Sequence, residues 1–337
     1  MNAWMRFALA VSIIVGGTSG VFAQTLPEQP PAPAVPPAPA PTVIAATVNG
    51  QEIQELAVFR GLLRYPPMKW AAARKEVLDY LIDNLLVDQY LSQLKIQVES
   101  KEIDDRFKQI QDEAVKIGQD FQDILRKLHL TEAEMRKELH AALRWDKFVL
   151  QQATEKVLQD YFQKNPAMFD GSQTQARHIL VSAKDDAEGV TKIAILKKGI
   201  DDEVAKELAK LPTGADKLIV DKKRTEAILT AFALAAEKDS TCPSKKQGGD
   251  LGWFRRVGDM VEPFARTAFA LQPFQLSDAV KSEFGYHLIL TVDRKAGREV
   301  RFEDVKPFVT EIYGERLRDA IIASYKPRSK IEIRDMK

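Results

Sequence analysis

The sequence predicts an α+β protein whose first half is mostly helical and whose second half mixes helices with short strands. Helical spacing of apolar residues begins at Val77 and Leu78 and recurs in segments up to residue 163. Short β-rich runs follow between residues 174 and 293. Two more strand-like runs lie near the ends of the chain, and each needs a partner for its backbone hydrogen bonds.

The first residues are typical of an export signal. Arg6 precedes the apolar run Phe7–Val15, and Val21 and Ala23 occupy the −3 and −1 positions of a cleavage site. We interpret 1–23 as a cleaved signal peptide. The alternative is an uncleaved inner-membrane anchor, although the run is shorter than the roughly 20 residues that span a bilayer. No cysteine follows the cleavage point, so no lipid anchor is expected, and a periplasmic location is favoured.

A linker and a helical domain are predicted next. Residues 24–42 are rich in proline and alanine, which favours an extended polyproline spacer. The helical domain is expected at 43–165, starting with a strand and a turn at Asn49-Gly50 and ending where Asn165-Pro166 breaks the pattern. After the helix that contains Val77, further helices are expected at 101–117, 119–128, 131–150 and 153–163. The third of these starts with a capping-box pattern at Thr131 and Glu134.

The second half alternates strands and helices. Strands are expected in "TQARHILV" and at 278–283 and 285–293, with helical material at about 184–238 and 262–271. The tail, 301–337, is an amphipathic helix that ends in the strand-like "SKIEIRD". We expect this last strand to pair with the one at 43–48, which would return the tail to the helical domain.

The net charge and the cysteine count exclude some classes of function. The 337 residues carry a formal net charge of +1, which argues against a general electrostatic attraction to nucleic acid or to membranes. The chain has one cysteine, Cys242, which cannot form an internal disulfide. Its position therefore points to a role other than a structural cross-link.

Three polar side chains, His178, Cys242 and His287, are placed by the pattern at the ends of strand-like runs. Cysteine with histidine also occurs in cysteine proteases and zinc sites, but no oxyanion-hole segment and no closely spaced ligand pair is present. Gly248-Gly249 lacks the Lys-Ser/Thr that would follow in a phosphate loop, so a tight turn is its simplest role. His129 and His140 are expected to be structural or exposed.

Four ordered segments carry a resemblance: "ARHILV" (176–181), "STCPSKKQGGDLGWF" (240–254), "MVEPFARTAFAL" (260–271) and "SEFGYHLIL" (282–290). They resemble the signature segments of the parvulin (PpiC-type, rotamase) peptidyl-prolyl cis/trans isomerases. The helical region and the tail are similar to the chaperone part of SurA/PrsA-type exported isomerases. For residues 174–293 the resemblance implies a small antiparallel four-stranded sheet wrapped by helices.

The resemblance also implies the site. Two neutral histidines would share a hydrogen-bond network beneath a pocket that grips the proline ring, with a polar group near the substrate carbonyl. Neither a cofactor nor a metal is implied. The catalytic positions would be His178, Cys242 and His287, and the substrate-binding positions Leu251, Met260, Phe264, Ser282 and Phe284.

Two features depart from the family pattern. The segment "SAKDDAEGV" is acidic where phosphate-directed members are basic, so a preference for phosphorylated substrates is not expected. An insertion at about 195–225 is predicted to add a surface helix pair, and it could shield or reshape the cleft.

The expected function is that of an exported isomerase and chaperone. It would bind unfolded exported polypeptides and isomerise their X–Pro bonds, with no nucleic acid and no small-molecule cofactor, and the linker leaves proximity to the membrane open. The main alternative is a holdase with an inactive parvulin domain. A structural cell-envelope adaptor that uses the linker is a third.

Overall fold

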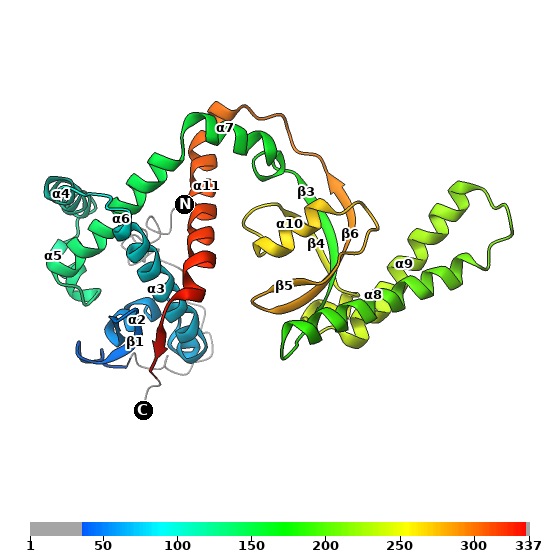
Figure 1. Cartoon of the computed structure of the whole chain (residues 1–337), viewed down its shortest axis with the longest axis horizontal. Coiled ribbons are helices and arrows are strands. Elements are labelled where there is room, and N and C mark those ends of the chain that lie inside the picture. The colour runs from blue at the N-terminus through cyan, green and yellow to red at the C-terminus, as the bar shows by residue number, and fades with distance from the viewer. Residues whose placement is uncertain (1–35, 335–337) are drawn as a thin grey trace, which may run out of the picture. The chain divides into compact units, whose positions relative to one another are not determined.

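The computed structural model describes residues 36–334 of the chain, so the predicted signal peptide and most of the predicted linker lie outside it. The chain divides into two compact units (Figure 1). One contains the residues up to Gln159 together with those from Pro307 on, and the other is Asp160–Lys306. No helix within 36–334 combines the length and the apolar character that crossing a bilayer needs. The domain bounds proposed from the sequence remain predictions.

The first unit is helical around a three-stranded antiparallel sheet of order β2-β1-β7. Ala46 of β1 lies opposite Ile333 of β7, so the expected pairing of the two terminal strands is present. Helices α7 (Glu155–Lys164) and α11 (Phe302–Tyr325) contribute residues to both units. The other elements of this unit are β1 (Ile44–Val48), β2 (Gln51–Gln54), α2 (Glu55–Leu62), α3 (Trp70–Gln93), α4 (Ser100–Lys116), α5 (Phe121–Lys127), α6 (Glu132–Gln152) and β7 (Ile331–Ile333).

Helix α3 organises the core of this unit. Its first two-thirds bury Val77, Ile82 and Leu86 against the sheet and α2. Its last turns pack on α6 and α11 in a second cluster formed by Val87, Leu91, Phe148 and Ile321. The C-terminal helix is therefore part of the core that the N-terminal strands begin. At the start of α6 the capping box predicted from the sequence is formed in both directions.

The second unit contains a four-stranded antiparallel sheet of order β4-β3-β6-β5, which confirms the predicted α+β class. Strand β3 is central and pairs with β6 along its whole length. The elements of this unit are β3 (Gln173–Val181), α8 (Asp186–Leu208), α9 (Lys217–Asp239), η3 (Pro243–Gln247), β4 (Asp250–Arg255), α10 (Glu262–Ala270), β5 (Val280–Ser282) and β6 (Gly285–Lys295).

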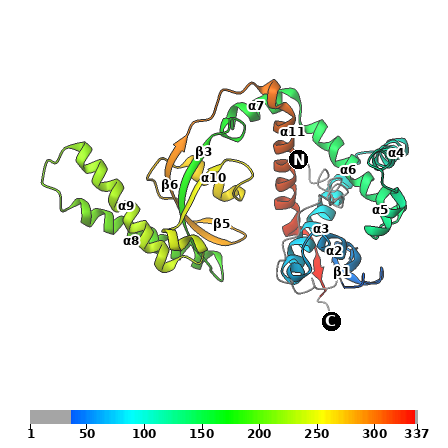
Figure 2. The same ribbon diagram turned by 180° about the vertical axis from the view of Figure 1, so that it is seen from behind.

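The two faces of this sheet are covered by different helices (Figure 2). Alternation along β3 sends Ile179 and Val181 to the face packed by α8 and α9. It sends Ala176 and His178 to the opposite face, where Ala176 packs in the cluster of α10 and the ring of His178 meets an aromatic ring of that helix. The sheet therefore has a structural face and a face that carries the histidines.

The insertion predicted at about 195–225 does not form a separate helix pair. It lengthens α8 and α9 into one long hairpin, whose turn at 209–216 contains Pro212 and Gly214 (Figure 1). Because α8 and α9 pack on the face opposite His178, the hairpin does not lie over the face with the histidines.

Candidate active site

The candidate site is built on a pair of buried histidines. His178 of β3 and His287 of β6 lie on adjacent antiparallel strands. His287 is opposite Leu180, two residues along β3 from His178, so both histidines point to the same face of the sheet. Their Nδ1 atoms are 3.1 Å apart and the rings are stacked at 21°. His178 is 6% exposed and His287 is 4% exposed, so this hydrogen bond is shielded from water.

Ser282 extends the network. Its hydroxyl oxygen lies 2.6 Å from Nε2 of His287 and accepts the backbone N–H of Phe284 at 3.1 Å. A neutral imidazole has one N–H, so two proton arrangements fit the chain of contacts. If Ser282 donates to His287, the Nε2–H of His178 is left as a buried donor without an acceptor, because that atom has no partner within residues 36–334. Buried orphan donors are rarer than orphan acceptors.

The reverse arrangement avoids this cost. His178 Nδ1–H then donates to His287 Nδ1, and His287 Nε2–H donates to Ser282 Oγ. Ser282 now accepts two hydrogen bonds, which fills both of its lone pairs, and its own O–H is free to donate. Ser282 is half-buried, whereas both histidines are buried, so its hydroxyl is the most accessible group of this network.

Both histidines are held neutral. Burial lowers the pKa of His178 to about 4. Burial, followed by repulsion from His178, lowers the pKa of His287 to about 4. At neutral pH the pair therefore carries no charge, as the resemblance implied.

Phe264 of α10 forms the aromatic wall beside the histidines. Its ring centroid lies 5.6 Å from that of His178 and 5.4 Å from that of His287, and both contacts are edge-to-face. Leu251 of β4 and Met260 pack against the same cluster while remaining partly exposed. Met260 and Phe264 are four residues apart in the sequence, which is the spacing of one helix face. Met260 instead precedes α10, in the loop that follows β4.

Two consecutive arginines hold this loop. Arg256, whose side chain is 6% exposed, donates two hydrogen bonds to the carboxylate of Glu262, at 2.6 and 2.8 Å. Arg255 makes a second two-point contact with Asp259 on the exposed side. The loop that carries Met260 is therefore fixed to the first turn of α10. Neither ion pair was predicted from the sequence, because charged residues near a turn usually form a solvated surface.

Cys242 lies beside the histidine strand but not at a strand end. It precedes the 3-10 helix η3, and its backbone N–H donates to Ser240 Oγ at 3.2 Å. Ser240 is 3% exposed and also accepts the N–H of Leu180, two residues after His178. Ser240 thus ties the segment with Cys242 to β3. The prediction of strand-end positions was wrong for Cys242, and also for His178, which lies within β3.

Two glycines shape the approach to β4. Gly249 has φ +79°, and its carbonyl oxygen accepts the N–H of His178 at 2.9 Å. A Cβ at this position would lie 2.4 Å from the carbonyl oxygen of His178, so only glycine lets the strands approach this closely. Gly252 has φ +67° and interrupts the alternation of β4. Leu251 and Phe254 can therefore both reach the histidine face.

The structure brings together most of the predicted site residues. His178, His287, Ser282 and Phe264 are in mutual contact through the interactions above. The side chain of Phe284 is 62% exposed, and only its backbone N–H joins the network. In the part of the chain that the structure describes, the Cys242 thiol makes no hydrogen bond to either histidine.

The remaining histidines lie in the first unit. The ring of His129 packs on Phe59, and the ring of His140 contacts the guanidinium of Arg144. Within residues 36–334, no group of three or more His, Cys, Asp or Glu side chains is arranged to hold a metal ion.

Comparison with known proteins assigns the class of this domain. Residues 178–293 match the family described as "Rotamase: PPIC-type PPIASE domain". The chain is 32% identical over 130 residues to the foldase protein PrsA of Bacillus subtilis, covering 35% of this chain and 43% of that protein. It is 25% identical over 267 residues to foldase protein PrsA 4 of Bacillus cereus, covering 78% and 77%. A crystal structure of PrsA from Bacillus anthracis aligns at 22% identity with a TM-score of 0.39, covering 77% and 99%.

The chain thus contains a parvulin-type peptidyl-prolyl isomerase domain, and beyond that domain it is similar to PrsA foldases. It spans about half of the length of the curated relatives that it matches first. The resemblance drawn from the four sequence segments is confirmed.

Proposed function

We propose that this chain is an exported peptidyl-prolyl cis/trans isomerase that also holds unfolded polypeptides. The neutral pair His178–His287 carries the proposal, because it lies buried beneath the edge of Phe264 within the rotamase domain. Such a surface combines an apolar wall for a proline ring with oriented, uncharged hydrogen-bond groups.

Prolyl isomerisation requires no covalent step, only binding of the substrate in the right conformation. Rotation about a peptide bond costs about 18–20 kcal/mol because it breaks amide resonance. A site accelerates rotation when it binds the twisted amide better than either planar isomer. Leu251, Met260 and Phe264 would hold the ring, and the free Ser282 hydroxyl or Cys242 would donate to the substrate carbonyl. A twisted amide has lost conjugation and has a less polarised carbonyl, so an apolar surface with uncharged histidines suits it better than a hydrated or charged surface would.

The other parts of the proposal rest on different observations. Export rests on the N-terminal sequence described above. Chaperone action rests on the similarity to foldases over 78% of the chain and on apolar side chains that the first unit exposes. These include Met68, Val115 and Leu150, which are 71–76% exposed. Unfolded exported polypeptides with X–Pro bonds are the proposed clients, as apolar segments would cover such side chains.

The structure weakens the alternative that the chain is a holdase without catalysis. It gained support from an insertion that could cover the cleft, but α8 and α9 pack on the opposite face of the sheet. We therefore retain an isomerase that also acts as a chaperone, rather than a holdase without catalysis, as the proposed function.

Two-dimensional exchange NMR on a short Ala-Pro peptide tests the proposal. The chain without residues 1–23 should accelerate exchange, and His287→Ala should reduce the rate while His129→Ala, in the other unit, should not. A chain that suppresses client aggregation without accelerating exchange would be a holdase. Equal rates for His287→Ala and the unaltered chain would refute the site.

A further inference from the structure

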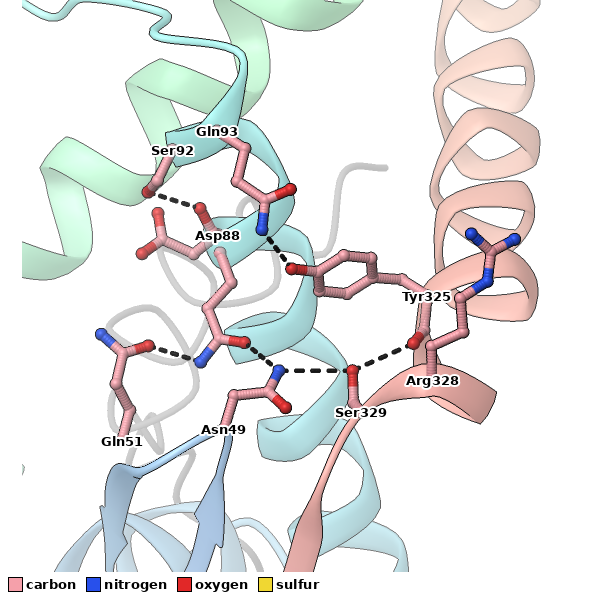
Figure 3. A pocket seen from close by; sticks show the side chains of 9 residues that line it. Asn49, Gln51, Asp88, Ser92, Gln93, Tyr325, Arg328 and Ser329 are labelled. Carbon is pink, nitrogen blue, oxygen red and sulfur yellow. Dashed lines mark hydrogen bonds between the residues drawn. The ribbon is translucent and has the colours of Figure 1, made fainter.

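The first unit contains a polar pocket that the proposed isomerase activity does not use. Its volume is about 420 Å³, within the range of small-ligand sites. It lies where the β1–β2 turn, the last turns of α3 and the segment after α11 meet (Figure 3). Unlike the proline-ring pocket, it is lined mainly by amide, hydroxyl and charged side chains.

One wall of the pocket is fixed by its own hydrogen bonds. Asn49 Nδ2 donates to Gln89 Oε1 at 2.7 Å and to Ser329 Oγ at 3.3 Å. Gln89 Nε2 in turn donates to Gln51 Oε1 at 2.6 Å and to a backbone carbonyl of β1. Asn49 and Gln89 thus have their amide groups occupied, and the wall exists before any ligand arrives.

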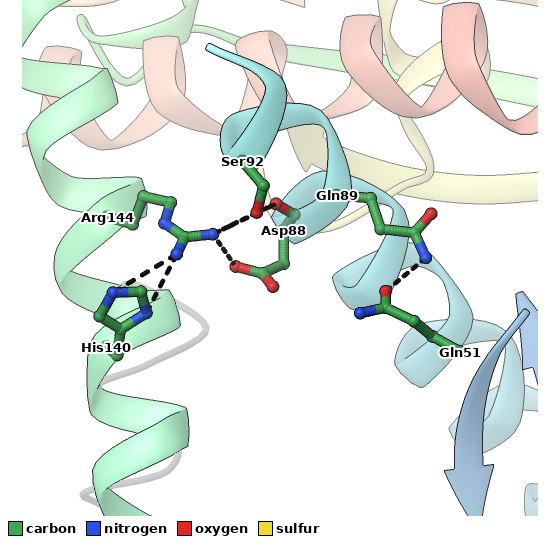
Figure 4. Close-up of polar contacts among 6 residues, drawn as sticks. All are labelled: Gln51, Asp88, Gln89, Ser92, His140 and Arg144. Carbon is green, nitrogen blue, oxygen red and sulfur yellow. Dashed lines mark hydrogen bonds and ion pairs between the residues drawn. The ribbon is translucent and has the colours of Figure 1, made fainter. Parts of the chain in front are cut away.

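The single carboxylate of the lining is already neutralised. Arg144 of α6 donates to Asp88 Oδ1 at 2.9 Å and to Ser92 Oγ at 2.5 Å (Figure 4). Its side chain is 13% exposed, so this cation is part of the structure behind the pocket. By contrast, Arg328 is exposed and makes no ion pair or side-chain hydrogen bond within residues 36–334. The lining therefore presents one unbalanced positive charge.

Three more groups of the pocket lining can form hydrogen bonds with a ligand. The Tyr325 hydroxyl accepts from Gln93 Nε2 at 2.5 Å, which leaves its O–H free to donate. Among residues 36–334, no group donates to Gln93 Oε1, and the amide N–H groups of Gln51 have no acceptor, because only its oxygen is engaged. Figure 3 shows Tyr325 and Arg328 on the same side of the pocket.

We propose that this pocket binds the C-terminal end of a polypeptide through its carboxylate. Arg328 and the Tyr325 hydroxyl donate to the carboxylate, Gln93 Oε1 accepts the N–H of the last residue, and Gln51 donates to the preceding carbonyl. A charge-assisted hydrogen bond from arginine is the strongest contact in this set. That the polypeptide is a client rests on the proposed chaperone role, whereas the carboxylate chemistry stands on the pocket alone.

Fluorescence anisotropy with a labelled, proline-free pentapeptide tests the inference. The full chain should bind the free acid at least about tenfold more tightly than the C-terminal amide, since a charge-assisted hydrogen bond is lost in the amide. Arg328→Gln should abolish the difference, and Arg328→Lys should retain part of it. Arg334→Gln is the matched control, because Arg334 is an exposed arginine of the same tail that does not line the pocket.

Other outcomes would overturn the proposal. Equal binding of acid and amide would show that no carboxylate is recognised there. Acetyl-alanine that binds as tightly as the peptide would identify a site for small carboxylates rather than for chain ends. Prolyl isomerisation measured on the same variants keeps the two proposals separate, because all three variants lie outside the isomerase domain and should leave its rate unchanged.

Discussion

The Nδ1 atoms of His178 and His287 lie 3.1 Å apart on neighbouring strands and share one hydrogen bond, which His178 donates in the arrangement described above. Each ring is buried, and each has a pKa of about 4. A second proton on either ring would place a charge against a ring that shares this hydrogen bond. Burial therefore favours the neutral form of the pair, and this has a measurable consequence for the pH dependence of folding.

Acidification should destabilise the isomerase domain through these two residues. Both pKa values lie below the usual 6.5, so the unfolded chain binds more protons than the folded chain between pH 6.5 and about 4. Above pH 6.5 the two histidines do not reduce the free energy of unfolding. As the pH falls from 6.5 toward 4, the free energy of unfolding decreases, because protons bind to the unfolded chain first. Each histidine contributes at most about 1.4 kcal/mol per pH unit in this window.

Urea unfolding at pH 7 and at pH 5 measures the effect. The variant with both His178→Leu and His287→Leu should lose less free energy of unfolding between the two pH values than the unaltered chain. Carboxylates that titrate in the same window contribute to both proteins and cancel in the comparison. Equal losses would mean that the histidines are not held neutral by the fold.

Ser282 should matter through its hydroxyl. Ser282→Ala removes the acceptor of the His287 Nε2–H and the donor proposed for the substrate, whereas Ser282→Thr retains both. One hydrogen bond is worth about 1 kcal/mol, so we expect roughly a five- to tenfold lower kcat for Ser282→Ala. Near-normal kcat is expected for Ser282→Thr. If alanine and threonine variants are equally slow in the exchange assay, the site needs the size of serine and not its hydroxyl.

Substitutions of Cys242 and of the apolar wall residues should affect different steps, the first catalysis and the second the binding of proline peptides. Cys242→Ala should weaken isomerisation with little change in stability, since the side chain is half-buried and forms no disulfide. Leu251→Ala, which removes a partly exposed wall residue, should raise KM for proline peptides. Phe264 is 2% exposed, so Phe264→Leu is preferable to alanine, which would open a cavity costing about 3–5 kcal/mol. Unchanged kinetics in all three variants would remove these residues from the site.

Arg256 should act as a positioning residue for the loop that carries Met260. Arg256→Met removes both hydrogen bonds that Arg256 donates to Glu262, so the loop should become mobile and KM should rise several-fold with a smaller change in kcat. Combining it with Glu262→Gln should recover part of the loss, because the partly buried carboxylate that has lost its guanidinium contacts is then replaced by a neutral amide. Arg255→Met is the control, since its side chain is 62% exposed and such pairs contribute little. A larger effect from Arg255→Met would contradict the assignment.

Helices, strands and their local caps were easier to predict from the sequence than contacts between distant side chains. The capping box of Thr131 and the pairing of the terminal strands followed from local rules, since a cap needs two residues three apart and an isolated strand needs a partner. The histidine pair joins residues 109 positions apart, and only the family resemblance suggested it.

The polar contacts were harder to foresee. The pairing of Arg256 with Glu262 and the contact of Tyr325 with Gln93 depend on which side chains the fold buries or aligns. Periodicity does not contain that information, because a charged or amide residue near a turn looks the same whether it is solvated or buried. The lengthened hairpin of α8 and α9 was also missed, as its break is marked only by Pro212 and Gly214.

Gly249 and Gly252 offer a matched pair for testing how closely the site is built. Both have positive φ, so an alanine at either position should cost about 1–2 kcal/mol of backbone strain. Only at Gly249 would the new Cβ also meet a fixed atom, the carbonyl oxygen of His178 at 2.4 Å, while nothing lies within 4 Å of a Cβ at Gly252. The carbonyl belongs to the central strand and cannot move without shifting the histidine.

Gly249→Ala should therefore destabilise the chain by clearly more than Gly252→Ala in urea unfolding, and it alone should also displace His178. A chemical-shift change of the His178 ring, followed by NMR of selectively labelled histidine, checks the second effect at temperatures where both variants are folded. Equal destabilisation with an undisturbed His178 ring in both variants would mean that the connection between η3 and β4 yields to the added methyl group. The close approach of Gly249 to β3 would then not be what holds the histidine in place.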